Sequence, residues 1–101
     1  MSKTFIAMDM KLFDKQTAAK FGMSIDVYNK KIIEKINSKV GEEDTLIIGG
    51  IFTKGNFLQT LNLVSQIKAK KILINREQYN LFSNEEYIEL GFNHIWNVDG
   101  S

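Results

Sequence analysis

Apolar residues along this chain follow two patterns, short continuous runs and wider helical spacings. Four short runs of β-branched and apolar residues, over residues 4–7, 45–48, 71–74 and 94–98, are typical of buried β-strands. The segments between them carry apolar residues at intervals of three or four, which predicts helices. Strands that alternate with helices favour a parallel sheet with right-handed crossovers. The expected fold class is therefore α/β, with about four mainly parallel strands and three or four helices.

The first half of the chain carries one strong and one weak helical pattern. An amphipathic helix is predicted over about residues 25–40, with Ser24 as its N-cap and Gly41 as its C-cap. The weaker pattern, over residues 15–21, predicts a short helix before it.

Two more helices are predicted in the second half. One begins after residue 56 and ends near residue 70, and its buried stripe consists of Phe57, Leu61, Val64 and Ile67. The other lies between Ser83 and Gly91, because Ser83 and Glu86 fit a capping box and glycine is a typical helix stop.

Length and composition favour one globular domain over residues 1–101, with 44% hydrophobic and 25% charged positions. The chain has no cysteine, which excludes disulfides, zinc–thiolate sites and a cysteine nucleophile. It also has no long apolar run at the N-terminus and no stretch of about 20 apolar residues, so we expect a soluble cytoplasmic protein that does not bind membranes.

The formal net charge of +1 gives no global electrostatic case for nucleic-acid binding. Two local basic clusters are predicted to be solvated surfaces, and they consist of Lys68, Lys70, Lys71 and Arg76, and of Lys30, Lys31, Lys35 and Lys39. Aromatic residues are not interleaved with them in a stacking pattern, so nucleic acid as a partner has only weak support.

Three stretches carry a family resemblance. Residues 5–14 run from an apolar strand into Asp9-Met10-Lys11, residues 32–50 run through a helix and a turn into a strand that ends at Gly49-Gly50, and residues 70–78 run from a strand into Asn75-Arg76-Glu77-Gln78. In this order they resemble calcineurin-like metallophosphoesterases, particularly the small bacterial and phage type, whose strands end in Asp-x-His, Gly-Asp and Gly-Asn-His-Asp or Gly-Asn-His-Glu. The resemblance spans residues 3–98 and implies a fold like the N-terminal half of that family's sandwich.

The metal ligands of that family are mostly replaced. The resemblance places Asp9 at a ligand position, Lys11 at the His position, Gly50 at the bridging Asp, and Arg76, Glu77 and Gln78 at the last ligand group. A two-metal centre needs carboxylates and imidazoles, which glycine and a lysine ammonium cannot replace. We therefore expect a vestigial site without metal or cofactor. The alternative is a divergent phosphoesterase or nuclease that keeps Asp9 and recruits Asp14 or Glu77.

The same residues also have structural interpretations. Asp9 at the end of a strand can cap a loop, and Asp14 can form a surface ion pair with Lys11. Gly49 and Gly50 fit tight packing of a strand into a loop better than a phosphate-binding loop, because no Lys-Ser/Thr follows them.

The leading functional hypothesis is a non-catalytic binding or inhibitory protein that works through a surface. The phage-type resemblance implies an anti-defence protein such as an anti-CRISPR with a protein partner. A third hypothesis is a structural homodimer, since half of the family's sandwich is missing and an apolar face would stay open. The expected interface anchors are Phe52, Phe57, Phe92 and Trp96.

Overall fold

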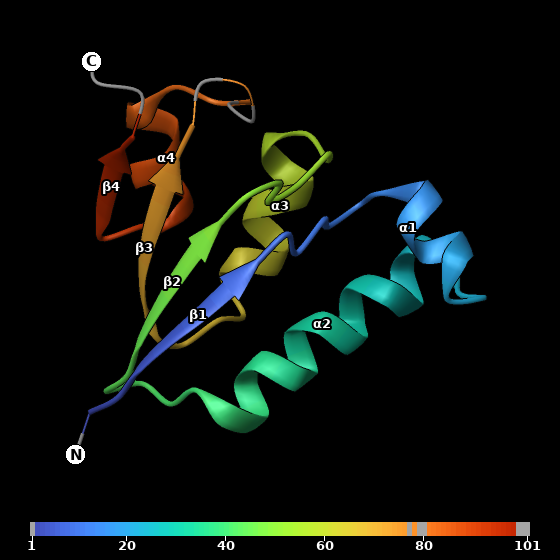
Figure 1. The fold of residues 1–101 in the computed structure, drawn as a ribbon, viewed down its shortest axis with the longest axis horizontal. Helices are drawn as coiled ribbons and strands as arrows, with labels where there is room; N and C mark the ends of the chain where they lie inside the picture. The colour runs from blue at the N-terminus through green and yellow to red at the C-terminus, as the bar shows by residue number, and fades with distance from the viewer. Residues whose placement is uncertain (1, 77, 79–80, 99–101) are drawn as a thin grey trace.

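The computed structural model describes residues 2–76, 78 and 81–98 of the chain (Figure 1). The order of elements is β1 (Thr4–Met8), α1 (Lys15–Lys20), α2 (Ile25–Lys39), β2 (Thr45–Gly49), α3 (Phe57–Val64), β3 (Lys70–Asn75), α4 (Asn84–Leu90) and β4 (His94–Asn97). The predicted α/β class, with four parallel strands and four helices among the described residues, is confirmed. No helix in these described ranges is both long and apolar enough to cross a bilayer.

The strands form one sheet in the order β1-β2-β3-β4, and all neighbouring pairs are parallel. In this order each connection leads from one strand to the next neighbour on the same side, so the chain crosses the sheet in one direction. Right-handed crossovers therefore place all their helices on the same face. In Figure 1, α3 and α4 lie behind the strands and α2 lies beside β1. The shortest dimension of the molecule is 21 Å, which matches one sheet layer and one helix layer.

The predicted helix N-termini are confirmed by their capping contacts. Ser24 Oγ accepts from the Val27 amide at 3.2 Å at the start of α2. At α4 the capping box is complete, since Ser83 Oγ accepts from the Glu86 amide and Glu86 Oε1 accepts from the Ser83 amide. Gly91 ends α4 in the left-handed region with a φ of 113°.

Two predicted C-termini differ from the structure. The last helical residue of α2 is Lys39 and its C-cap is Val40, one residue before the expected Gly41. Helix α3 ends at Val64, well before residue 70, because the chain turns there with the Ile67 amide donating to the Val64 carbonyl. Ile67 is buried as predicted, but from a turn rather than from a helix.

The core lies between the helices and the face of the sheet that carries Leu46, Ile48 and Leu73. A chain of edge-to-face aromatic contacts crosses it, with ring centroids 5.4–5.9 Å apart, in the order Phe57, Phe82, Tyr87, Phe92 and Phe52. Phe52 and Phe92 are only 4% and 2% exposed, and Phe57 is partly buried against the same core. These three expected interface anchors are therefore core residues, which corrects that expectation.

Candidate functional site

The carboxyl ends of β1 and β2 bring Asp9 beside Gly50. Asp9 follows Met8, which is level with Gly49 in the sheet. The Asp9 amide donates to the Gly49 carbonyl at 3.0 Å, and Asp9 Oδ1 accepts from the Ile51 amide at 2.9 Å. The carboxylate thus holds the loop that follows β2, which is the loop-cap role predicted as its structural interpretation.

Gly50 is required by this arrangement. Its φ is 70°, in the left-handed region that side chains rarely adopt. A Cβ at this position would overlap Asp9 Oδ1 and lie 3.2 Å from the Asp9 amide nitrogen. Position 50, where the resemblance would place a bridging carboxylate, therefore has no room for a side chain in this conformation.

The loop after β1 has an unusual backbone. Asp9, Lys11 and Phe13 have φ values of 53°, 51° and 61°, so every second residue is left-handed. Hydrogen bonds across to the loop after β2 hold this shape, because the Lys11 amide donates to the Ile51 carbonyl and the Leu12 amide to the Phe52 carbonyl, both at 3.0 Å. Such conformations cost of order 1 kcal/mol each and persist only where the surroundings enforce them.

Asp14 serves as the N-cap of α1. Its Oδ1 accepts from the amides of Gln16 at 3.1 Å and Thr17 at 3.4 Å, and its Oδ2 lies 3.6 Å from Lys54 Nζ. Burial alone would raise the pKa of Asp14, but the hydrogen bonds and the Lys54 ammonium lower it below its ordinary value of 3.8. The ion pair predicted for Asp14 exists, but its partner is Lys54 rather than Lys11.

The residues of the third motif follow the end of β3. Arg76 and Gln78 are exposed, and Glu77 lies outside the described residues. In the described portion of the chain, no three His, Cys, Asp or Glu side chains converge in a way that could hold a metal ion. Among the described motif residues, the structure places the Asp9 carboxylate against Gly50.

Sequence reasoning missed an asparagine cluster at the carboxyl end of β3. Asn75 is 7% exposed and donates to Asn84 Oδ1 at 3.2 Å and to Asn97 Oδ1 at 3.3 Å. The signal was present, since Asn75 directly follows the predicted strand 71–74, Asn97 lies near the end of the predicted strand 94–98, and Asn84 lies at the start of a predicted helix. The amides join the ends of β3 and β4 to the start of α4.

Lys71 is also placed differently from its prediction as part of a solvated surface. It is 8% exposed, and its Nζ donates to the carbonyls of Ile67 at 2.8 Å and Ala69 at 3.1 Å. Burial lowers its pKa from the ordinary value of 10.5. The alternation of β3 explains the placement, because Lys71 shares the helix-facing side with Leu73.

None of the helices in the described ranges covers the opposite face of the sheet, which is largely apolar. Its side chains, here called the open face, are those of Ile6, Met8, Ile47, Ile72, Ile74 and Trp96. Ile6, Met8 and Trp96 are 68%, 57% and 50% exposed, and the other three are partly exposed. None of the six belongs to the core cluster. Of the four expected interface anchors, only Trp96 lies here.

The open face is continuous across the strands. Ile6, Ile47 and Ile72 are level with one another, and Ile74 is level with Trp96. Met8 lies over Gly49, where a Cβ would be 2.8 Å from Met8 Sδ and 3.6 Å from Ile74 Cδ1. A polar row of Thr4, Thr45 and Lys70 borders the apolar rows at the amino ends of the strands.

Comparison with known proteins adds information about the fold only. No protein-family model and no curated protein matches the sequence. Among solved structures, the chain is similar to AQ665 from Aquifex aeolicus, a protein of unknown function, with a TM-score of 0.69 and 18% sequence identity. The match covers 93% of this chain and 50% of AQ665, so this chain spans about half the length of that structural neighbour.

Proposed function

We propose that this protein is a non-catalytic binding protein on a reduced metallophosphoesterase-like scaffold, and that it assembles through its open face. The observation that supports this most is the apolar, continuous surface formed by Ile6, Met8, Ile72, Ile74 and Trp96 on a sheet with helices on one side only. Contiguous apolar patches of this kind are uncommon on monomeric proteins and mark interaction sites.

A second copy of the chain is the partner proposed for the isolated protein. Two sheets can pack face to face about 10 Å apart, with their apolar side chains interdigitating, as in a sandwich. Each 100 Å² of apolar surface removed from water contributes about 2.5 kcal/mol, which is large against the stability of a small domain. A two-fold axis would then bring the same surface from both copies together.

The carboxylates support a non-catalytic role. Asp9 holds the Ile51 amide and Asp14 caps α1, so two of the three acids proposed for a divergent hydrolase have structural roles. The third, Glu77, lies outside the described residues. An inhibitory role against a host enzyme, as in an anti-CRISPR, is part of the proposal and rests on the phage-type resemblance alone.

Metal titration separates this proposal from the hydrolase alternative. In calorimetry with Mn²⁺ we expect no affinity tighter than about millimolar, because one carboxylate does not make a two-metal site. A stoichiometric micromolar isotherm that is lost in Asp9→Ala would overturn the proposal in favour of the enzyme.

Light scattering coupled to size exclusion tests the assembly. We expect the wild type to have twice the protomer mass of 11.6 kDa, and Trp96→Glu to have the protomer mass. Leu58→Glu is the matched control, since Leu58 is 73% exposed on α3 and lies away from the open face. A monomeric wild type, or dissociation by Leu58→Glu but not by Trp96→Glu, contradicts the proposal.

A further inference from the structure

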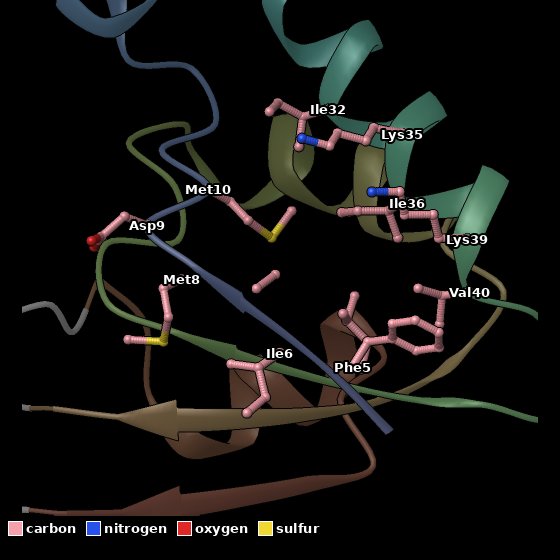
Figure 2. A pocket seen from close by; sticks show the side chains of 12 residues that line it. Phe5, Ile6, Met8, Asp9, Met10, Ile32, Lys35, Ile36, Lys39 and Val40 are labelled. Carbon is pink, nitrogen blue, oxygen red and sulfur yellow. The ribbon is translucent and has the colours of Figure 1, made fainter. Parts of the chain in front are cut away.

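A groove lies beside the outer edge of β1 and extends to helix α2 (Figure 2). Its lining includes Ile6 and Met8 of the open face as well as residues on the helix side of β1. Strand β1 is an edge strand, because the sheet order begins with it. The groove has a volume of about 350 Å³, and α2 runs alongside β1 at its outer border (Figure 1). The space next to β1 is thus partly roofed by a helix but holds no strand.

The backbone of β1 offers unpaired hydrogen-bonding groups to this groove. The Lys3 carbonyl accepts from the Thr45 amide and the Asp9 amide donates to the Gly49 carbonyl, so odd-numbered residues of β1 point their backbone groups at β2. Because these groups alternate along a strand, the amides and carbonyls of residues 4, 6 and 8 point outwards. An edge of this kind is a template for another strand.

The groove walls are apolar. Phe5 and Ala7 of β1 pack against the core on the helix side of the sheet. Ile32 and Ile36 of α2 and its C-cap Val40 line the groove with them, and Figure 2 shows Phe5 facing these three residues. Four of these five side chains are only partly buried. Side chains of an added strand on this side would therefore bury apolar surface against both β1 and α2.

Two lysines give the groove a positive rim. Lys35 and Lys39 are one turn apart on α2, both line the groove, and both are exposed. The ion pairs among the described residues are Lys30–Glu34 and Lys54–Asp14, which leaves these two lysines without a carboxylate partner there. Asp9 also lines the groove, but its Oδ1 holds the Ile51 amide. Two lysines against one carboxylate leave the groove lining with a net positive charge, which favours an acidic ligand.

We propose that this groove binds an extended, acidic segment of a partner protein, which adds to β1 as a fifth strand. Its backbone pairs with residues 4, 6 and 8, its apolar side chains enter the groove, and its acidic side chains meet Lys35 and Lys39. This surface shares Ile6 and Met8 with the open face, whereas Trp96 lies on β4 at the opposite edge of the sheet.

A second copy of the chain fits this edge less well than a single segment. Pairing β1 with the β1 of a second copy would set the two strands about 4.8 Å apart. The α2 helices of the two copies, each of which lies beside its own β1, would then compete for the same space. Packed helices require about 8–10 Å between their axes. A lone strand without a helix layer of its own avoids this conflict.

Selection of displayed random peptides of about twelve residues against the intact protein provides the probe. We expect enriched peptides to alternate β-branched and other residues and to carry Asp or Glu. Their affinity should fall at least about tenfold for Lys35→Glu/Lys39→Glu. Lys15→Glu/Lys68→Glu is the matched control, since both lysines are exposed and lie outside the groove, and its effect should be small.

Backbone methylation of a selected peptide tests strand addition directly. Methyl groups on every second amide should abolish binding, and those on the intervening amides should not, while the amides of residues 4 and 6 gain protection from hydrogen exchange. Trp96→Glu should bind the peptide as the wild type does, which separates this site from the proposed assembly. Failure to enrich acidic peptides, equal loss with the control lysines, insensitivity to alternate methylation, or loss only in Trp96→Glu would each overturn the proposal.

Discussion

Asp9 and Gly50 depend on each other at the end of the first two strands. The Asp9 carboxylate occupies the space that a side chain at position 50 would need, and it holds the Ile51 amide from there. A family-like bridging carboxylate at position 50 would therefore displace the loop before it could bind a metal ion. A side chain at position 50 is thus excluded by the backbone around it as well as by the Asp9 carboxylate.

Substitution of Gly50 should lower the free energy of unfolding by more than the strain of its positive φ alone, because the new side chain would also overlap Asp9. Gly22→Ala is the matched control, because Gly22 has a similar φ of 66° and nothing within 4 Å of its Cβ position. We expect Gly22→Ala to lower the free energy of unfolding by about 1 kcal/mol and Gly50→Ala by at least about 2 kcal/mol, measured by urea denaturation. Equal losses would show that the Asp9 contact is unimportant.

Gly50→Asp should also fail to create a hydrolase. The variant should be destabilised like Gly50→Ala and should not cleave an aryl phosphodiester in the presence of Mn²⁺, since Lys11 also replaces a ligand of the family. Metal-dependent turnover by this single variant would show that the remaining site is more complete than we infer.

Lys71 should make stability depend on pH in the alkaline range. Burial lowers its pKa in the native state from the ordinary 10.5. Between the native and unfolded pKa values the unfolded chain binds more protons, so the free energy of unfolding rises with pH across this window. At pH values below this window Lys71 is charged in both states, and the full free-energy cost of burying its ammonium group lowers the stability of the native state.

Comparison with Lys71→Met isolates this contribution. The pKa values of Tyr28 and Tyr87 are raised chiefly by burial, so these two residues make the free energy of unfolding fall as the pH rises. Both tyrosines are present in the wild type and in the variant, so their effect cancels in the comparison. The stability of the wild type relative to Lys71→Met should therefore improve as the pH rises from about 7 towards 10, as followed by urea denaturation. A difference that stays constant over this range would contradict a lowered pKa.

At the scale of elements, the sequence predicted what local chemistry determines. Strand runs and capping residues such as Ser24 and Ser83 specify their own neighbourhoods, and they were found where predicted. The end of α3 was not, because Ile67 satisfies the apolar spacing of a helix while it is buried from a turn. Whether a large aromatic such as Phe92 faces the core or a partner depends on tertiary packing, which spacing does not encode.

Phe92 joins α4 to the loop after β2 through edge-to-face contacts with Tyr87 and Phe52. We expect Phe92→Ala to lower the free energy of unfolding by about 3–5 kcal/mol, since it leaves a cavity and removes both aromatic contacts. Phe21→Ala is the control, because Phe21 is 64% exposed and its loss should be below about 1 kcal/mol. Thermal and urea unfolding measure both, and a small effect of Phe92→Ala would mean that this aromatic chain is not central to the core.

At the scale of the whole molecule, strand order decides which surface is left uncovered. The strand order β1-β2-β3-β4 and the uncovered face that results from it cannot be predicted from the sequence of any single segment. An open apolar face was nevertheless expected, on the strength of the family resemblance alone. The sequence could not say which residues line it, since that follows from the register that aligns Ile6, Ile47 and Ile72.

If a second copy covers this face, unfolding is coupled to dissociation, and thermal stability must depend on protein concentration. Each tenfold rise in concentration then stabilises the dimer by about 1.4 kcal/mol, which for two chains of this size raises Tm by roughly 3–5 °C. Trp96→Glu should lower Tm and remove the dependence, because a carboxylate within an apolar interface is costly to bury. Leu58→Glu should keep it, since Leu58 lies on α3 and not on the open face. Differential scanning calorimetry from about 2 to about 200 µM decides the matter. A wild-type Tm that is constant over this range would mean that the helix layer alone stabilises the fold and that the open face is tolerated in water.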